Sequence, residues 1–105
     1  MALLGDLETS VMEVLWGSDR PLSVHEVHSA LRKERDLAYT TIMTVLCRLT
    51  KKGIASRQLE GRAWLYKPVA TRVDMVMGEI QDLLSGLPAT EQSAALERIA
   101  EKVAS

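Results

Sequence analysis

The spacing of apolar residues in the first part of the chain predicts a helix over residues 6–16. Asp6 is suited to cap the amino end of this helix, and Gly17 follows its last residue, where helices commonly stop. One face of the helix carries its apolar side chains, which are Leu7, Val11, Val14 and Leu15.

A second helix is predicted to begin near Ser23. Glu26 follows Ser23 by three residues, and at this spacing each side chain accepts a hydrogen bond from the backbone amide of the other residue. The charged segment 32–36 then leads the chain into a loop. The residues predicted to face inward are Val24, Val27, His28 and Leu31.

A third helix has the clearest pattern in the chain. Its apolar residues repeat at positions i, i+3, i+4 and i+7, and Gly53 follows its basic end. A helix with this pattern buries one side and exposes the other. The buried side is predicted to consist of Ile42, Val45, Leu46 and Leu49.

The opposite side of the third helix has a different composition. Short hydroxyl side chains lie near its start, and positive charge lies near its end. The residues on this exposed side are Thr40, Met43, Thr44, Cys47, Arg48 and Lys51.

After the third helix the pattern changes to short stretches that contain Ile, Val, Leu, Trp and Tyr. Two such stretches, 54–59 and 63–69, flank a turn at residues 60–62, and together they predict a β-hairpin. Gly61 suits the position of positive φ in the turn. Pro68 is expected to end the pairing because proline has no amide hydrogen.

Two further amphipathic helices are predicted in the tail of the chain. Thr71 and Asp74 supply a capping signal for the first, which stops at residues 85–86, and Pro88 lies near the start of the second. Their apolar residues exceed what two short helices can bury against the preceding head, so we expect them to form a homodimer interface. This set is Val73, Val76, Met77, Ile80, Leu83, Leu84, Leu87, Leu96, Ile99 and Val103.

The composition of the 105-residue chain indicates one functional module, with 47% hydrophobic and 26% charged residues. Its single cysteine, Cys47, cannot form an internal disulfide or by itself a thiolate metal cage. No apolar run is long enough to span a membrane, and the first residues lack a secretory pattern. We therefore expect a cytoplasmic protein without a membrane partner.

The net charge of −1 conceals an uneven distribution of charge. Residues 37–69 contain six lysines and arginines against one glutamate, whereas residues 70–105 contain three basic residues against six acidic ones. The basic stretch is a candidate surface for a polyanion. The acidic tail is expected to avoid DNA.

Three helices followed by a hairpin are the order of elements in a winged helix-turn-helix. The predicted fold class is mainly α with a small β-hairpin, with a winged helix-turn-helix head over residues 1–70 and C-terminal dimerisation helices over residues 71–105. In such a head the third helix enters the major groove, and the hairpin reaches the backbone or the minor groove. The residues predicted to bind DNA are Tyr39, Thr40, Thr41, Met43, Thr44, Arg48, Lys51, Arg57 and Arg62.

Several motifs appear in order along residues 4–70. They are LGDLE at 4–8, VMEVLW at 11–16, AYTTIMTVLCRL at 38–49, KKG at 51–53 and GRAWLY at 61–66. Together they resemble the penicillinase-repressor family, also called the BlaI/MecI family. The resemblance implies a dimeric repressor of antibiotic-resistance or stress genes. Its third helix, here Tyr39 to Lys51, would read a palindromic operator in double-stranded DNA, and its C-terminal helices would hold the dimer together.

Two regulatory features of this family have no counterpart in the sequence. In the antibiotic-resistance branch a sensor-linked protease cuts the dimerisation region at an Asn-Phe bond, but this sequence contains no phenylalanine. The protease is therefore a candidate partner whose cleavage site is unknown. The copper-responsive branch uses paired cysteines near its C-terminus, and no cysteine follows Cys47 here.

Other chemistries have weaker support. His25 and His28 have a spacing that can serve a metal, yet no third ligand accompanies them, so we expect no metal and no cofactor. The sequence lacks a nucleophile with a plausible base and a Gly-rich phosphate loop, which argues against an enzyme. Trp16 and Trp64 are expected to complete the core. The alternative function is a winged-helix module that binds protein instead of DNA.

Overall fold

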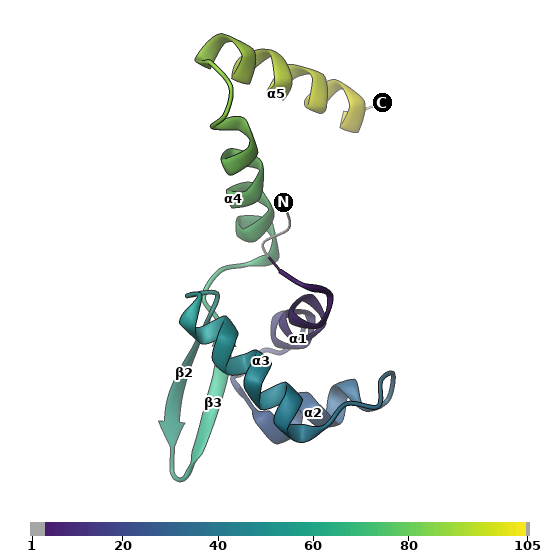
Figure 1. The fold of residues 1–105 in the computed structure, drawn as a ribbon, viewed down its shortest axis with the longest axis vertical. Helices are drawn as coiled ribbons and strands as arrows, with labels where there is room; N and C mark the ends of the chain where they lie inside the picture. Colours follow the sequence, from purple (N-terminus) through teal and green to yellow (C-terminus); the bar gives the residue numbers. More distant parts are fainter. Residues whose placement is uncertain (1–3, 105) are drawn as a thin grey trace. The chain divides into compact units, whose positions relative to one another are not determined.

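The computed structural model describes residues 4–104, and the chain divides into two units between Arg72 and Val73. The first unit holds three helices and a small sheet, and the second holds most of the two remaining helices (Figure 1). The predicted fold class, mainly α with a small β-hairpin, is confirmed. The elements are α1 (Asp6–Trp16), β1 (Leu22–Ser23), α2 (Val24–Leu31), α3 (Tyr39–Lys51), β2 (Ala55–Glu60), β3 (Ala63–Pro68), α4 (Arg72–Leu84) and α5 (Ala89–Ala104).

The core of the first unit lies where α1, α2 and α3 pack against one another and against the sheet. The apolar stripe predicted for α3 is confirmed, because Ile42 and the three apolar residues that follow it at helical spacing are at most 3% exposed. Burying one such side chain contributes about 1.5 to 3 kcal/mol to stability. The other elements add Val11, Met12, Leu15, Val27 and Tyr66 to this core.

The amino end of α1 differs from the prediction. Gly5 caps the helix, and its amide donates a 3.0 Å hydrogen bond to Oε1 of Glu8. Asp6, the predicted cap, is the first helical residue, and its carboxylate accepts a 2.8 Å hydrogen bond from Nη2 of Arg35. The prediction for Asp6 is therefore wrong, because the Glu8 carboxylate satisfies the amide at the cap and Asp6 forms an ion pair instead.

The capping box predicted at the start of α2 is confirmed. Oγ of Ser23 accepts a 3.2 Å hydrogen bond from the amide of Glu26, and Oε1 of Glu26 accepts a 3.0 Å hydrogen bond from the amide of Ser23. The other carboxylate oxygen of Glu26 pairs with Arg20. The hydrogen bond from Arg20, together with that from the Ser23 amide, lowers the pKa of Glu26 to about 2.

A short strand that the sequence pattern did not predict joins the hairpin. β1 pairs with β3 so that Leu22 lies opposite Tyr66, and the strand order is β1-β3-β2. The turn of the hairpin contains two residues, because Glu60, predicted to be part of the turn, pairs with Ala63. Gly61 has a φ of +64°, and glycine adopts this conformation without the steric cost of a β-carbon.

The two tryptophans lie in different environments. Trp16 is half-buried, and its Nε1 donates a 2.9 Å hydrogen bond to the carbonyl of Ala70. The Arg72 guanidinium lies 5.1 Å from the centre of the same ring, so Trp16 attaches the segment after β3 to α1. Trp64 is 42% exposed. The prediction that Trp64 completes the core is wrong, because the hairpin continues beyond Tyr66, where the core ends.

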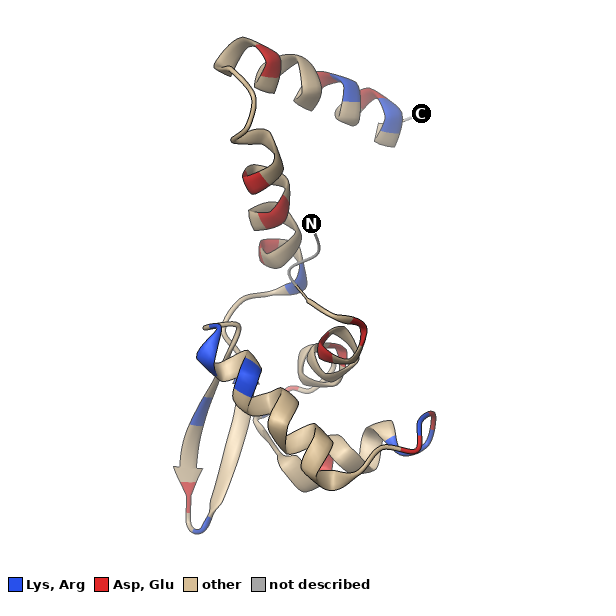
Figure 2. Ribbon diagram, in the orientation of Figure 1, with Lys and Arg blue, Asp and Glu red and all other residues tan. Residues whose placement is uncertain are grey.

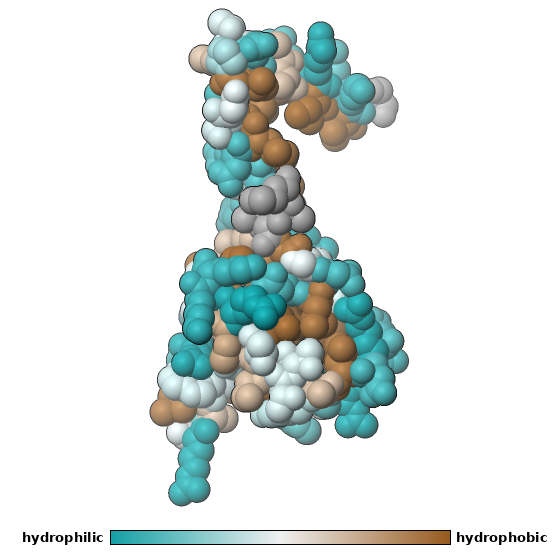
Figure 3. Space-filling model, in the orientation of Figure 1, coloured by the Kyte–Doolittle hydropathy of each residue, from teal (hydrophilic) through white to brown (hydrophobic). Residues whose placement is uncertain are grey.

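Helices α4 and α5 confirm the two amphipathic helices predicted for the tail. No residue in either helix is buried, and hydrophobic side chains gather along one side of each (Figure 3). Because neither helix has a buried residue, the apolar faces of α4 and α5 are open to solvent in the single chain. Within residues 4–104, no helix is long and apolar enough to cross a membrane.

The depressed pKa of Glu26 predicts how acid destabilises the first unit. A carboxylate with a pKa of about 2 in the folded chain and an ordinary value of 4.5 stabilises the fold above pH 4.5, and this contribution is lost as the pH falls toward 2. Glu26→Gln should therefore be less stable than the wild type at pH 7, and the difference should shrink between pH 4.5 and pH 2.

Urea unfolding at a series of pH values measures this difference. Glu13→Gln on the exposed face of α1 is the matched control, because no ion pair joins Glu13 to another residue within 4–104. A constant difference between Glu26→Gln and the wild type across this pH range would contradict the assignment.

Candidate nucleic-acid interface

The side of α3 opposite its buried stripe faces solvent and forms an open groove of about 430 Å³. Four of the residues predicted to bind DNA line this groove. Tyr39 and Thr40 are exposed at the beginning of the same helix, whereas Thr41 is half-buried. The residues that line the groove are Met43, Thr44, Cys47, Arg48 and Lys51.

The side chains of this groove differ in chemical character along the helix. The hydroxyl of Thr44 donates a 2.9 Å hydrogen bond to the carbonyl of Thr40. The Thr44 oxygen keeps lone pairs for accepting a hydrogen bond, and Met43 provides exposed apolar surface beside it. Arg48 adds donors one turn later. Acceptor, apolar and donor groups of this kind match the edges that base pairs present in the major groove.

The start of α3 is held by polar contacts from the elements before it. Nε2 of His28 lies 2.6 Å from the carbonyl oxygen of Leu37, and the His28 ring meets the Tyr39 ring edge to face at 5.9 Å. Arg35, in the same loop, donates hydrogen bonds to Asp6 and, at 3.4 Å, to Ser10 on α1. The loop that leads into α3 is therefore attached to both preceding helices.

The end of α3 is held by an ion pair with α1. Glu8 is 6% exposed, and both of its carboxylate oxygens accept 3.0 Å hydrogen bonds from Nζ of Lys52. Burial raises the pKa of Glu8, but hydrogen bonds from the Gly5 amide and from Lys52 more than offset this effect, so the pKa lies below its ordinary value. Lys52 thus has a structural partner, although the sequence counts it within the basic stretch.

Arg57 in β2 and Arg62 in the turn bring positive charge to the hairpin, and both are exposed. The guanidinium of Arg57 lies 4.2 Å from the centre of the Trp64 ring, and its Nη1 donates a 3.5 Å hydrogen bond to Oη of Tyr66. This hydrogen bond raises the pKa of Arg57. The contact between Arg57 and Trp64 was not predicted from the sequence. The signal that could have indicated it is strand alternation, which places Trp64 on the same face as Tyr66.

Charge is divided between the two units as the sequence predicts. Figure 2 shows basic residues on the carboxyl-terminal part of α3 and on the hairpin, and acidic residues along α4. The acidic residues of α4 are Asp74, Glu79 and Asp82. The positively charged surface therefore belongs to the first unit.

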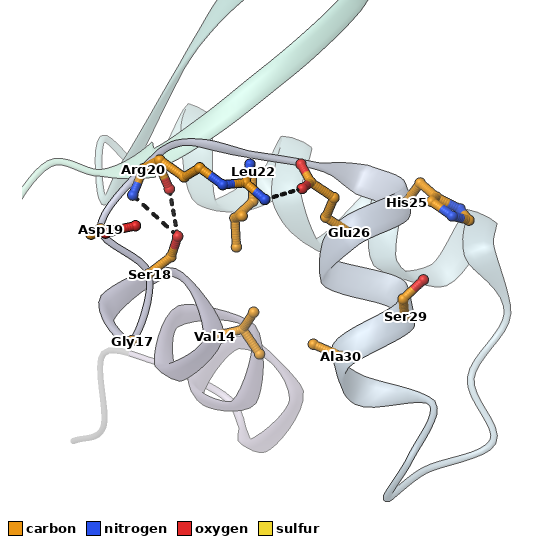
Figure 4. Close-up of a pocket in the computed structure, with 10 residues that line it drawn as sticks. All are labelled: Val14, Gly17, Ser18, Asp19, Arg20, Leu22, His25, Glu26, Ser29 and Ala30. Atoms are coloured by element: carbon orange, nitrogen blue, oxygen red, sulfur yellow. Dashed lines mark hydrogen bonds and ion pairs between the residues drawn. The ribbon is translucent and has the colours of Figure 1, made fainter.

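A second open groove, of about 720 Å³, lies between α1 and α2 (Figure 4). Val14 and Ala30 face it from the two helices, and the ion pair of Arg20 and Glu26 borders it. None of the residues predicted to bind DNA is among those that line it. His25 also lines this groove, but in the described part of the chain no three His, Cys, Asp or Glu side chains are grouped to hold a metal ion.

Comparison with protein families matches residues 4–105 to the family described as penicillinase repressor. The chain is 45% identical over 101 residues to the transcriptional regulator BlaI of Mycobacterium tuberculosis, a match that covers 95% of this chain and 73% of that protein. It is 34% identical over 73 residues to the penicillinase repressor of Bacillus licheniformis, covering 70% and 56% of the two chains.

Solved structures show the same likeness. The DNA-binding domain of the repressor BlaI matches with a TM-score of 0.62 and 34% identity, covering 70% of this chain and 88% of that domain. The Bacillus licheniformis BlaI monomeric form in complex with the blaP half-operator matches with a TM-score of 0.58 and 35% identity, covering 68% and 85%. MepR, a transcription regulator of Staphylococcus aureus, matches 97% of this chain and 79% of its own at a TM-score of 0.60, but at 14% identity it supports the fold alone.

The two neighbouring lysines at the end of α3 should differ in their effect on stability. Lys52→Met leaves the buried Glu8 carboxylate without its cation, which should lower the free energy of unfolding by about 1 to 3 kcal/mol. Lys51→Met is the matched control, because Lys51 lines the open groove and its replacement should change stability by less than about 0.5 kcal/mol. Urea unfolding of both variants at pH 7 tests this difference, and equal losses would contradict the structural role of Lys52.

Proposed function

The chain belongs to the penicillinase repressor family, and we propose that it is a transcriptional repressor that binds a palindromic operator as a homodimer. The open face of α3 carries this proposal. It combines exposed Thr44, Met43 and Arg48 in one groove on a helix that is otherwise firmly packed. An α-helix fits the major groove of DNA, and these side chains supply the groups that distinguish base pairs there.

The residues on and around α3 have different roles in DNA binding. Thr44 and Arg48 contact base edges, while Lys51 at the end of the helix neutralises phosphate. Arg62 reaches the backbone or the minor groove from the tip of the hairpin. Tyr39 and Thr40 lie at the start of the helix, where the first residues of a reading helix meet DNA.

The homodimer is formed by the second unit. Its two helices leave most of their apolar side chains exposed in the single chain, including Val76 and Met77 on α4 and Leu96 and Ile99 on α5. A second copy covers this surface by two-fold pairing. Two-fold symmetry also places two reading helices one or more DNA turns apart, about 34 Å for a single turn, so the dimer requires a palindromic operator.

Selection of fragments from the source genome that bind the full chain tests this function and identifies the regulated genes. A palindrome beside a resistance, sensor or stress gene is the expected result. A salt titration against random duplex separates the alternative, since a DNA binder loses affinity steeply as salt rises. A chain with no duplex affinity at low salt would instead be a winged-helix module that binds protein.

Substitutions on the open face of α3 should weaken operator binding without unfolding the chain. Arg48→Ala and Thr44→Ala each remove a base contact, which costs about 1 to 3 kcal/mol of binding free energy. Arg98→Ala on α5 is the control, since it removes the same charge far along the sequence from the reading helix. Operator titration checks this, and wild-type affinity in both α3 variants would rule out the reading helix.

Placing a charge on the apolar face of α4 should break the dimer and lower operator affinity together. Ile80→Asp buries an unpaired carboxylate in the interface, at a cost of several kcal/mol. Gln81→Asp introduces the same carboxylate at the next residue, about 100° around the helix from Ile80, and should leave the dimer intact. Sedimentation and operator titration measure both properties, and a wild-type chain that sediments as a monomer at micromolar concentration would refute the dimer.

A further inference from the structure

We propose that Trp64 is a positioning residue for DNA binding, which holds the guanidinium of Arg57 against its ring so that this group meets a backbone phosphate between the reading helix and the hairpin. This role rests on the proposed function. Trp64 does not need to touch DNA itself, because it acts through Arg57.

The register of the hairpin places the residues concerned on one face. Arg57 lies directly opposite Tyr66, and Leu59 lies directly opposite Trp64. Side chains of opposed residues in an antiparallel pair point to the same face, and so do residues two apart in one strand. Arg57, Leu59, Trp64 and Tyr66 therefore share a face. Tyr66 is buried, while Leu59 and Trp64 are exposed further along the hairpin.

The shared face turns toward α3. β2 packs against α3, and Tyr66 on this face belongs to the core that α3 helps to form. Arg57 therefore belongs to the strand that packs against α3, the helix whose open groove contains Arg48 and Lys51.

Two contacts restrict where the Arg57 guanidinium can point. The Trp64 ring, 4.2 Å away, covers one face of the guanidinium, and Oη of Tyr66 accepts a hydrogen bond of 3.5 Å from its Nη1. The remaining N–H groups stay available, since a guanidinium carries five donors. An exposed arginine otherwise loses side-chain entropy when it binds, so a guanidinium held in place binds phosphate at lower cost.

A double-mutant cycle on a random-sequence DNA duplex tests this role, because a phosphate contact needs no operator. Arg57→Ala should reduce the slope of log K against log salt by about 0.9, the value for one lost phosphate contact. Trp64→Leu keeps apolar bulk but removes the aromatic face, and should lower duplex affinity about two- to fivefold, the range of an exposed cation–π contact. In the Arg57→Ala background, Trp64→Leu should have no further effect.

Two more variants separate positioning from packing. Trp64→Phe keeps an aromatic face and should retain most of the affinity that Trp64→Leu loses. Leu59→Ala removes the cross-strand neighbour of Trp64 and should change affinity little in either background. Nuclear magnetic resonance of the free chain gives a readout without DNA, because the Trp64 ring current should shift the Arg57 side-chain protons upfield, and this shift should vanish in Trp64→Leu.

The outcomes distinguish this role from the function on which it rests. If the wild type binds duplex but Trp64→Leu lowers affinity equally with and without Arg57, Trp64 contacts DNA directly or supports the fold, and the positioning role is overturned. Absence of the upfield shift overturns it as well. If the wild type binds no duplex at any salt concentration, the proposed function fails and the positioning role fails with it.

Discussion

The structure depends on the burial of one side of α3. The stripe that begins at Ile42 and ends at Leu49 is almost completely removed from water, and this packing keeps a helix of 13 residues formed. Isolated helices of this length are marginal in water, so the helical state of α3 depends on its contacts with α1, α2 and the sheet. Because the apolar residues recur at helical spacing, burying this stripe leaves the side with Thr44 and Arg48 exposed. One constraint thus accounts for both the core and the exposed face to which DNA reading is assigned in our proposal.

Apolar packing alone does not fix where a helix ends or its position along its own axis. Polar contacts at both ends of α3 fix this position. At its start His28 holds the Leu37 carbonyl and the Tyr39 ring, and at its end Lys52 holds the buried Glu8 carboxylate. Hydrogen bonds depend strongly on distance and angle. These contacts therefore hold the exposed face of α3 at a defined position, as the proposed recognition of base edges would require.

Local patterns in the sequence were sufficient to predict the helices and the exposed face of α3, because a helical period and a capping box depend only on nearby residues. Contacts between distant residues were not accessible in this way. Lys52 counts as one more basic residue until the fold places it beside Glu8, 44 residues earlier. The strand β1 has only two residues and depends on pairing with β3. The prediction that Trp64 completes the core rests on the general preference of aromatic residues for small cores, which does not show how far the hairpin extends beyond the core.

In the second unit, the stability of the two helices is linked to formation of the proposed homodimer. Helices α4 and α5 have 13 and 16 residues, and neither contains a buried side chain in the single chain. Helices of this length gain most of their stability from packing of an apolar face, which a second copy would provide. Dimer formation and ordering of the tail then become one equilibrium that depends on protein concentration. Two heads joined in this way would bind a palindrome with a high effective concentration for the second half-site. In the proposed assembly, operator occupancy would therefore respond steeply to the amount of repressor, even with few base contacts from each head.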